Sequence, residues 1–371
     1  MQFQEPGTNS SAVLDSLQIV DSRLLNTKSL RKVGASIALG WDFRLFSGLT
    51  HLSLAGSCSE IPRAQTSQRD FLDALRRMPT LQHLDLNGPV LPEAVDRSPL
   101  EPVYLPDLRD LSVFDTVSTI EFFLNHVIFS ATTRTAIGCK HLGPVLRLAD
   151  ISPVLVPLKR LISERPRTLR LHHIKISFYR DPEEDDMIDL RFQGWVFPGL
   201  SSLKGYNPKL PSGTPGFTFF VKWNSEVDVL PADIDEFSVG VFGLFSEDDV
   251  LSLSLSSYDI TDIWFRPFFH KISQLPALNA LFLDYLTSSL FLLELNRDVP
   301  QEEVNPSMAI YPALLYLKCR LTTPDPKILY KFLKKRPGHG LGPRKLRLDL
   351  FGPQILNKEV IALLETVAEI V

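Results

Sequence analysis

The sequence predicts an α/β fold: a leucine-rich-repeat solenoid, or horseshoe, with one parallel sheet on its concave face and helices outside. The first observation is a repeated phrase in which a proline is followed two positions later by leucine. Apolar residues then stand three and five positions beyond that leucine. Copies occupy residues 79–86, 106–113, 276–283 and 312–319, with a weaker copy at 198–205. The second observation is the step between copies, as from Leu49 to Leu81, which matches or exceeds the repeat length of about 20–29 residues in this class.

Each phrase has the pattern of a short strand. A strand alternates its side chains between two faces, so the leucines point into the core and the residues between them point the other way. The same alternation predicts strands at 14–19, 30–35, 49–54, 134–139 and 250–255. A variant phrase, Pro-Arg-x-Leu-Arg-Leu, occupies residues 166–171 and 343–348. Together these segments predict about ten to twelve strands in one parallel sheet.

Helical segments with one apolar face precede several strand phrases, and the intervening proline stops each helix. Ser67 is predicted to cap the first helix. Ser118 and Glu121 form a capping box for the second, and Asp325 with Pro326 begins the third. The apolar faces carry Phe71, Leu72, Leu75 and Met78, then Ile120, Phe123, Leu124 and Val127, then Ile328, Leu329, Phe332 and Leu333.

The chain of 371 residues is predicted to hold one repeat domain, because a solenoid grows by adding repeats. Residues 1–13 are polar, so we expect a flexible tail there, followed by the leucine-rich-repeat domain over 14–371. Residues 174–248 fit the period poorly. Their polar stretches at 181–186 and 207–213 are expected to be irregular insertions.

The composition predicts a soluble intracellular protein, cytoplasmic or nuclear. Hydrophobic residues make up 44% and charged residues 22%, which is globular rather than disordered. A net charge of −4 does not suggest nucleic-acid binding. No apolar run is long enough to span a membrane, and the first residues lack a signal-peptide pattern. Cys58, Cys139 and Cys319 are far apart and odd in number, which fits a reducing compartment.

The residues between the leucines point onto the predicted concave face and are the candidate partner-binding residues. Those of the early repeats are polar, whereas the later repeats contribute two large aromatic rings. Aromatic anchors with a polar surround are typical of protein interfaces. The alternative is ordinary packing, with the rings covered by a helix or an insertion. The row comprises His51, Ser53, His83, Asp85, Asp110, Ser112, Phe282, Tyr316 and Lys318.

The strand phrases, the helix at 71–78 and the segment 46–54 resemble the repeat region of fungal F-box-type leucine-rich-repeat proteins. The resemblance covers residues 14–370. In that family an N-terminal F-box docks the protein on a Skp-type adaptor of a cullin ubiquitin ligase, and the repeats hold the substrate. The resemblance therefore implies a non-enzymatic, protein-binding module that recognises a substrate for ubiquitination.

The chain departs from that family at its beginning. An F-box usually opens with a Leu-Pro-x-Glu pattern, which residues 1–48 do not contain. We therefore expect a Skp-type adaptor as a partner only if an F-box precedes this chain. The alternative is a free-standing leucine-rich-repeat scaffold or inhibitor with no ubiquitin role.

Two histidine patterns could indicate chemistry but have simpler interpretations. His172 and His173 are adjacent, so on a strand they face opposite ways, and no third ligand completes a metal site. We therefore expect them to be a surface or loop pair. His51, His83 and Asp85 could support acid–base catalysis, but no serine or cysteine nucleophile motif accompanies them. We expect no enzymatic activity, no metal and no cofactor.

Two further patterns lie near the C-terminus. The glycines of 338–342 follow a helix instead of opening one, so we expect a turn rather than a phosphate-binding loop. The basic residues 334–336 and 344–345 fit a solvated helix end, with a nuclear-import signal as the alternative. Neither pattern predicts an activity.

Overall fold

The chain divides into two compact units, each built from mostly parallel strands that alternate with helices. Unit 1 comprises residues 1–144, 149–166 and 216–224, and unit 2 comprises 145–148, 167–215 and 225–371. This arrangement confirms the predicted α/β solenoid class. The computed structural model describes residues 2–4, 12–13, 32–37, 46–56, 67–92, 99–141, 143, 146–180, 187–196, 213–224, 231–257, 262–296, 313–320, 326–335, 346–351 and 358–371.

In unit 1, strands from successive repeats lie side by side in one sheet. Across that sheet the order is β12 (Phe217–Asn224), β9 (Arg134–Lys140), β7 (Asp110–Thr116), β5 (His83–Asn87), β4 (His51–Gly56), β3 (Lys32–Ile37), β1 (Gln2–Gln4) and β2 (Ala12–Val13). Neighbours from β12 to β3 are parallel, whereas β1 is antiparallel to both β3 and β2. Two short strands, β6 (Val103–Leu105) and β8 (Val127–Phe129), form a separate parallel pair.

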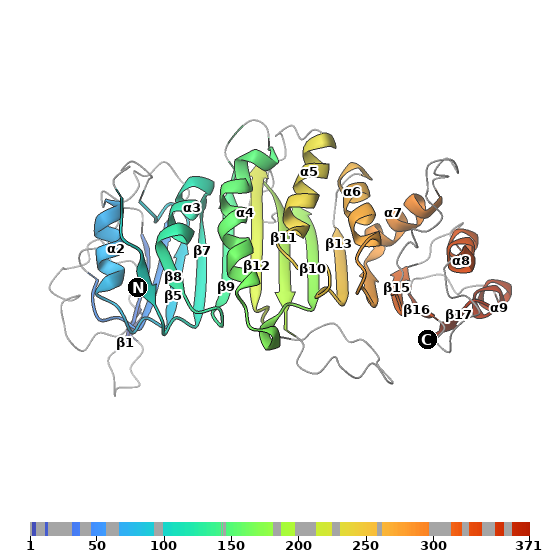
Figure 1. Ribbon diagram of the computed structural model, residues 1–371, viewed down its shortest axis with the longest axis horizontal. Coiled ribbons are helices and arrows are strands. Elements are labelled where there is room, and N and C mark those ends of the chain that lie inside the picture. Colours follow the sequence, from blue (N-terminus) through green and yellow to red (C-terminus); the bar gives the residue numbers. More distant parts are fainter. Residues whose placement is uncertain are drawn as a thin grey trace. The chain divides into compact units, whose positions relative to one another are not determined.

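The helices of unit 1 lie on one side of its strands (Figure 1). They are α2 (Gln68–Arg76), α3 (Val117–His126) and α4 (Leu148–Ser163). Helix α3 contacts β7 and β9. Among the described residues of unit 1, the opposite side of these strands carries no helix, and we call it the helix-free face.

The leucines of the strand phrase build the core of unit 1, as predicted. Leu81, Leu84 and Leu86 are each at most 1% exposed. On the helix side, Phe71 of α2 and Phe123 of α3 are fully buried, with ring centroids 6.3 Å apart. Each such burial stabilises the fold by about 1.5–3 kcal/mol. The equivalent positions of two other copies are at most 2% exposed: Leu49, Leu52, Leu54, Leu108, Leu111 and Val113.

One backbone hydrogen bond recurs where successive strands of unit 1 begin. The Gln82 amide donates to the Thr50 carbonyl at 2.8 Å. The Arg109 amide donates to the Gln82 carbonyl at 2.8 Å, and the Arg134 amide to the Arg109 carbonyl at 2.8 Å. The repeat in the sequence is therefore a repeat in bonding, which holds the strands in a constant register.

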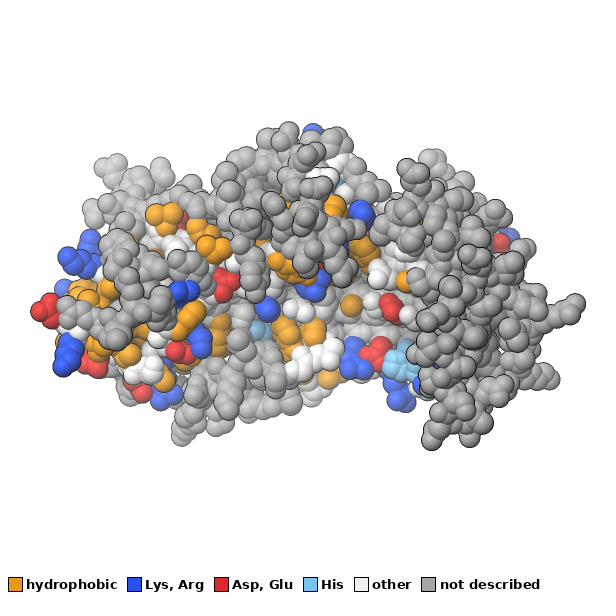
Figure 2. Space-filling model, turned by 180° about the vertical axis from the view of Figure 1, so that it is seen from behind, with side chains coloured by type: hydrophobic (Ala, Val, Ile, Leu, Met, Phe, Trp, Pro, Cys, Tyr) orange, Lys and Arg blue, Asp and Glu red, His pale blue; other side chains and the backbone are white. Residues whose placement is uncertain are grey.

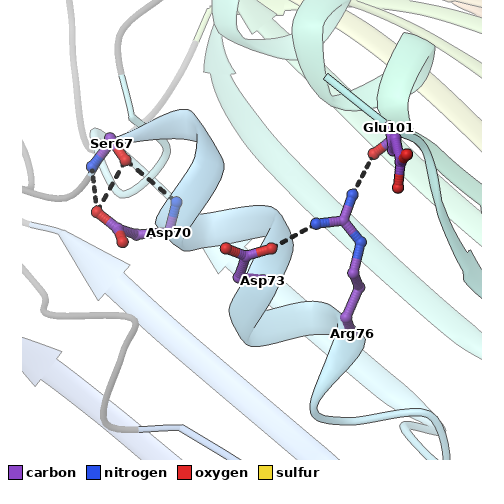
Figure 3. A network of polar contacts seen from close by, with 5 residues as sticks. All are labelled: Ser67, Asp70, Asp73, Arg76 and Glu101. Carbon is purple, nitrogen blue, oxygen red and sulfur yellow. Dashed lines mark hydrogen bonds and ion pairs between the residues drawn. The ribbon is translucent and has the colours of Figure 1, made fainter. Parts of the chain in front are cut away.

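Helix α2 has the predicted cap (Figure 3). The Ser67 hydroxyl oxygen accepts a hydrogen bond from the Asp70 amide at 3.1 Å, and the Ser67 amide donates to the Asp70 carboxylate at 3.4 Å. These reciprocal bonds satisfy two backbone donors at the helix beginning. At the other end, Arg76 pairs with Asp73 and donates to the Glu101 carbonyl, which ties α2 to the chain just before β6.

The capping box predicted for α3 is wrong. Helix α3 begins at Val117, directly after β7, with Thr116 at the capping position and no capping bond from its side chain. Because no loop separates strand and helix, Ser118 lies inside the first turn. The hydroxyl of Thr119 instead donates to the Thr116 carbonyl at 2.9 Å.

The strands of unit 2 also lie side by side in a sheet, and one pair of them is antiparallel. Across it the order is β17 (Ala368–Ile370), β16 (Leu346–Phe351), β15 (Tyr316–Arg320), β14 (Ala280–Leu283), β13 (Ser252–Ser257), β10 (His173–Arg180) and β11 (Met187–Trp195). Strands β10 and β11 are antiparallel, whereas the other neighbours are parallel. The prediction that every strand would be parallel is therefore wrong at β1 and at the β10–β11 pair.

Consecutive helices of unit 2 pack against one another. They are α5 (Pro231–Phe242), α6 (Asp262–Ser273), α7 (Tyr285–Asn296), α8 (Pro326–Lys335) and α9 (Lys358–Glu365). The helix predicted to begin at Pro326 does so. The apolar phrase positions of β14 and β15 are at most 3% exposed: Leu278, Leu281, Leu283, Leu314, Leu317 and Cys319.

Residues 166–248 differ from the prediction in two ways. Residues 167–169 form a 3₁₀ turn instead of a strand, because the chain turns directly after α4 and β10 begins only at His173. The stretch 174–248, predicted to hold insertions, contributes β10, β11, β12 and α5. Its polar stretches at 181–186 and 207–212 lie outside the described residues.

Some predictions fall where the structure describes little or nothing. The strand at 14–19, the weak phrase at 198–205 and the glycines of 338–342 lie outside the described residues. Strands β1 and β2 lie within the predicted tail; backbone pairing does not measure flexibility, so the flexible tail stays a prediction. Within the described ranges, no helix has both the length and the apolar character needed to cross a membrane.

Candidate protein-binding face

The candidate site lies on the helix-free face of unit 1, where the residues between the buried leucines are partly exposed. Figure 2 views the molecule from the side opposite Figure 1 and shows basic, acidic and histidine side chains gathered among apolar ones. The strand register places side chains from successive repeats in rows that cross the sheet. Three of these rows carry the site.

The first row is a polar ladder formed by His51, His83, Asp110 and Arg134, one residue from each of β4, β5, β7 and β9. The imidazole rings of His51 and His83 stack with centroids 4.1 Å apart. Asp110 accepts from both sides: its carboxylate lies 2.7 Å from His83 Nδ1 and pairs with the Arg134 guanidinium. The ladder is therefore a continuous chain of contacts across four repeats.

Burial, more than the neighbouring charges, keeps His51 neutral at neutral pH. Burial lowers the pKa of His51 to about 4, and electrostatic interactions with His83 and Lys32 lower the pKa further, against the opposing effect of Asp110. Lys32 is the register neighbour of His51 on β3 and is exposed. The His51 Nδ1 lies 2.9 Å from the Thr50 hydroxyl.

The second row lies two residues further along each strand and holds Ser53, Asp85 and Ser112. The Ser53 hydroxyl donates to the Asp85 carboxylate at 3.0 Å. Sequence reasoning placed Asp85 beside the histidines as a catalytic alternative. The structure corrects this, because the carboxylate that contacts His83 belongs to Asp110 and comes from the next repeat.

The third row contains an aromatic pair, Phe114 on β7 and Phe220 on β12, which flank Gly138 on the strand between them. The two rings stack with centroids 5.3 Å apart and planes inclined by 23°. They meet because Gly138 has no side chain: a Cβ there would lie 2.1 Å from the Phe220 Cζ. Both rings are partly exposed on the helix-free face.

Two lysines follow the aromatic pair. Lys140 on β9 and Lys222 on β12 occupy the same register position on neighbouring strands and are partly exposed. The Lys222 ammonium lies 5.6 Å from the centroid of the Phe114 ring, which is within the range of a cation–π contact. This end of the helix-free face thus combines aromatic surface with positive charge.

Sequence reasoning missed the aromatic pair and both lysines. The signal that could have found Phe114 is the strand alternation, which continues past Asp110 and Ser112 to position 114 on the same face. Gly138 inside a predicted strand also signals a close approach of other atoms. No local signal predicts that Phe220 lies two strands away from Phe114.

In unit 2 the structure corrects the expected exposure of the two aromatic residues. Phe282 and Tyr316 lie on neighbouring strands with ring centroids 5.4 Å apart, and each is only 6% exposed. Together with Ala280 they form a buried cluster. Their alternation on the strands was predicted, but tertiary packing removes them from the accessible surface. Their predicted role in partner binding is untested.

Tyr316 and Lys318 converge on one carboxylate. The Tyr316 hydroxyl donates to Asp349 at 2.8 Å, and the Lys318 ammonium lies 2.9 Å from the same oxygen. Burial raises the pKa of Tyr316, and the hydrogen bond to Asp349 raises it further. The Lys318 ammonium also lies 5.7 Å from the centroid of the Phe351 ring. Lys318 therefore has partners within its own sheet.

His173 of β10 is buried, which corrects the expectation of a surface histidine pair. It is 1% exposed, and its Nδ1 and Nε2 lie 2.7 Å and 3.2 Å from the hydroxyl oxygens of Ser252 and Ser254. The rings of Trp195 and Phe282 meet it edge-on. Burial lowers the pKa of His173 to about 4, with Lys175 as the smaller cause. The hydroxyls thus satisfy a neutral, buried imidazole.

The two described cysteines are buried in the core. Cys139 and Cys319 are buried free thiols, and burial raises the pKa of Cys139. Cys58 lies outside the described residues. No group of three or more His, Cys, Asp or Glu side chains able to hold a metal ion occurs among the residues that the structure describes. The partly exposed rows of unit 1 can offer hydrogen bonds, charge and aromatic contact to a partner.

Comparisons with models of known protein families and with curated proteins find no match for this chain. The class of protein therefore comes from the fold and the site. It is an α/β repeat protein of the solenoid type, with strand phrases stacked in register and a helix-free face in unit 1.

Proposed function

We propose that the protein is a non-enzymatic binding module that holds a partner protein on the helix-free face of unit 1. The observation that carries the proposal is the set of partly exposed rows, in which the polar ladder and the aromatic pair lie on one face. Aromatic residues with a polar surround supply most of the binding energy in many protein interfaces. Because each row draws one residue from each repeat, the stacking of repeats builds the surface.

We propose further that the partner is a substrate for ubiquitination and that this chain is the substrate-recognition region of a cullin-type ligase receptor. The support is the resemblance of the strand phrases and of the preceding helix to F-box-type leucine-rich-repeat proteins. A Skp-type adaptor would bind only if an F-box accompanies the chain. The alternative role is a free-standing scaffold or inhibitor that uses the same surface, and either role places the protein in the cytoplasm or nucleus.

The test is affinity purification of the tagged full chain from cells, with partners quantified by mass spectrometry. A Ser112→Arg variant places a long side chain in the centre of the helix-free face. The matched control is Val156→Arg, which places the same side chain on α4, where Val156 is 72% exposed. We expect a specific partner to be depleted by the first variant and retained by the second.

The ligase role has its own outcome in the same experiment. Recovery of ubiquitin-pathway components, together with a partner whose ubiquitination rises when the protein is supplied, supports the receptor. A partner that depends on Ser112 but is recovered without any ubiquitin-pathway component supports the scaffold. Partners that are lost equally from both variants would overturn binding through this face.

A further inference from the structure

We infer that the helix-free face of unit 1 holds its partner in a proton-sensitive way. The partner binds while the stacked rings of His51 and His83 are both neutral, and it is released when one of them gains a proton in mild acid. The inference rests on the proposed function, because it concerns how binding to that face is regulated. It draws on the polar ladder and on Lys32, the register neighbour of His51.

The two imidazole rings lie too close together to be charged at the same time in mild acid. Their centroids are 4.1 Å apart, with planes inclined by 22°, on the neighbouring strands β4 and β5. Two positive charges at that separation repel one another, so the pair takes up protons one at a time. The stack of His51 and His83 therefore has a neutral state and a singly charged state.

The rest of the ladder is balanced while both rings are neutral. Asp110 pairs with the Arg134 guanidinium, and its carboxylate lies 2.7 Å from the Nδ1 of His83. The negative charge of Asp110 is thus already offset by Arg134 when His83 is neutral. A proton on His83 gives this group of three side chains one net positive charge.

Two other charged side chains on the described strands lie near the rings. Lys32 is exposed beside His51, so it places a positive charge at the outer end of the row. Asp85 stands two residues after His83, about 7 Å along the strand. It accepts a hydrogen bond from the Ser53 hydroxyl at 3.0 Å. Neither side chain changes the charge difference between the two states of the stack.

The segments that lead into β4, β5, β7 and β9 belong to the described chain, so the charges on this side of the row are known. Residues 46–50 and 130–133 carry none. The other two segments contribute Arg77, Asp107 and Arg109, and all three are exposed. Water and salt therefore screen their effect on the rings.

A partner that covers the ladder selects the neutral rings. Burial disfavours the charged form of a histidine, because a protein environment solvates an ion less well than water does. This effect is already present in the free protein, where partial burial lowers the pKa of His51 to about 4. Under a partner both rings lose more water, so the bound state holds fewer protons than the free state. Affinity is then complete above the ordinary histidine pKa of about 6.5 and falls as the pH drops below it.

His83 is the ring that changes. His51 stays neutral until the pH approaches about 4, so a proton taken up in mild acid goes to His83, whose Nδ1 faces a carboxylate. A histidine with the ordinary pKa is about one-tenth neutral at about pH 5.5. A partner that needs the neutral ring should therefore bind about tenfold more weakly there than at about pH 7.5.

The test uses the full chain and the cellular partner that Ser112→Arg depletes, recovered by the affinity purification and then purified. The dissociation constant is measured by biolayer interferometry at several values between about pH 7.5 and about pH 5.5. We expect about tenfold weaker binding at the lower pH, with full recovery when the pH is raised again. Circular dichroism at each pH checks that the chain stays folded.

A variant of one ring locates the effect. His83→Gln keeps a side chain that can donate to Asp110 but cannot gain a proton. Its affinities at the two pH values should be nearly equal, whatever its affinity at the higher pH. The matched control, His270→Gln, removes an exposed histidine from α6 in unit 2 and should keep the tenfold ratio. Both variants retain the buried His173, so any effect of acid on unit 2 is common to them.

Nuclear magnetic resonance of the histidine rings gives a readout that needs no partner. In the free chain we expect the ring signals of His83, assigned through His83→Gln, to move over the same pH range. Those of His51 should stay in place. His83 signals that do not move would overturn the inference, even where no partner is recovered.

Two binding results would also overturn it: equal affinity at both pH values in the wild type, or an undiminished pH effect in His83→Gln. Failure of the proposed function is distinguishable, because there the cellular partner would survive Ser112→Arg at the higher pH. A partner that is lost in Ser112→Arg but binds the wild type equally at both pH values would retain the function and reject proton-sensitive release.

Discussion

The buried histidine of β10 predicts that unit 2 loses stability in mild acid. His173 is 1% exposed, and its two ring nitrogens lie 2.7 Å and 3.2 Å from the hydroxyls of Ser252 and Ser254. The perturbation that isolates it is His173→Gln. A glutamine amide can both donate and accept a hydrogen bond, so it can contact the same two hydroxyls, but it does not titrate.

The magnitude follows from the two states of the imidazole. Its ordinary pKa is 6.5, whereas in the fold the pKa is about 4 because burial disfavours the charged form. Between these values the unfolded chain binds a proton that the folded chain does not. The stability contribution is therefore complete above the ordinary pKa and is lost as pH falls toward the folded pKa. This linkage predicts a loss of about 2 kcal/mol between about pH 7.5 and about pH 5.

The assay is urea unfolding of the wild type and of His173→Gln at several pH values, followed by tryptophan fluorescence and circular dichroism. The quantity of interest is the change in the free energy of unfolding with pH, compared between the two proteins. This comparison cancels other titrating groups, including His51, whose pKa is also lowered. We expect the wild type to lose about 2 kcal/mol more than the variant on acidification. Parallel loss in both proteins would refute the conclusion that His173 is neutral and buried in the fold.

Three further substitutions test the packing. Ser67→Ala should lower the free energy of unfolding by about 1 kcal/mol, because it removes the cap of α2, and a thermal melt indistinguishable from wild type would contradict the capping role. Gly138→Ala should push the ring of Phe220 aside and change its side-chain NMR shifts, and unchanged shifts would show that the rings do not meet over this position. Phe282→Ala should cost about 3–5 kcal/mol in chemical denaturation, because the ring is buried, whereas a solvent-exposed anchor would leave stability nearly unchanged.

Strand alternation predicted which side chains share a face but not which of them contact one another. Strand alternation assigned His51, His83 and Asp110 to one face, and the structure places them in one row of contacts. The alternation of side chains is set within each strand, so it does not depend on how neighbouring repeats pack. Which carboxylate meets which histidine depends on the register between strands, which only the pairing of repeats decides.

The two buried aromatic residues show that strand alternation does not predict exposure. Phe282 and Tyr316 follow the same alternation as the polar residues, yet they are buried while His83 is partly exposed. Exposure depends on what covers a face, and that is a property of contacts between distant segments. A strand pattern gives the direction of a side chain but not what lies in front of it.

By itself the sequence determined the repeating unit. The spacing of leucines within each phrase requires a strand with one buried face, and the recurrence of the phrase requires that such strands stack, because each alone cannot bury its apolar side. The cap of α2 was also readable, since the reciprocal bonds of Ser67 and Asp70 span a single turn. The tertiary structure alone decided that β9 lies between β7 and β12, and therefore that Phe114 and Phe220 meet over Gly138. The physical reason is that strand order joins residues far apart in the chain. The residues next to Phe114 or Phe220 in the sequence do not indicate which distant ring each one contacts.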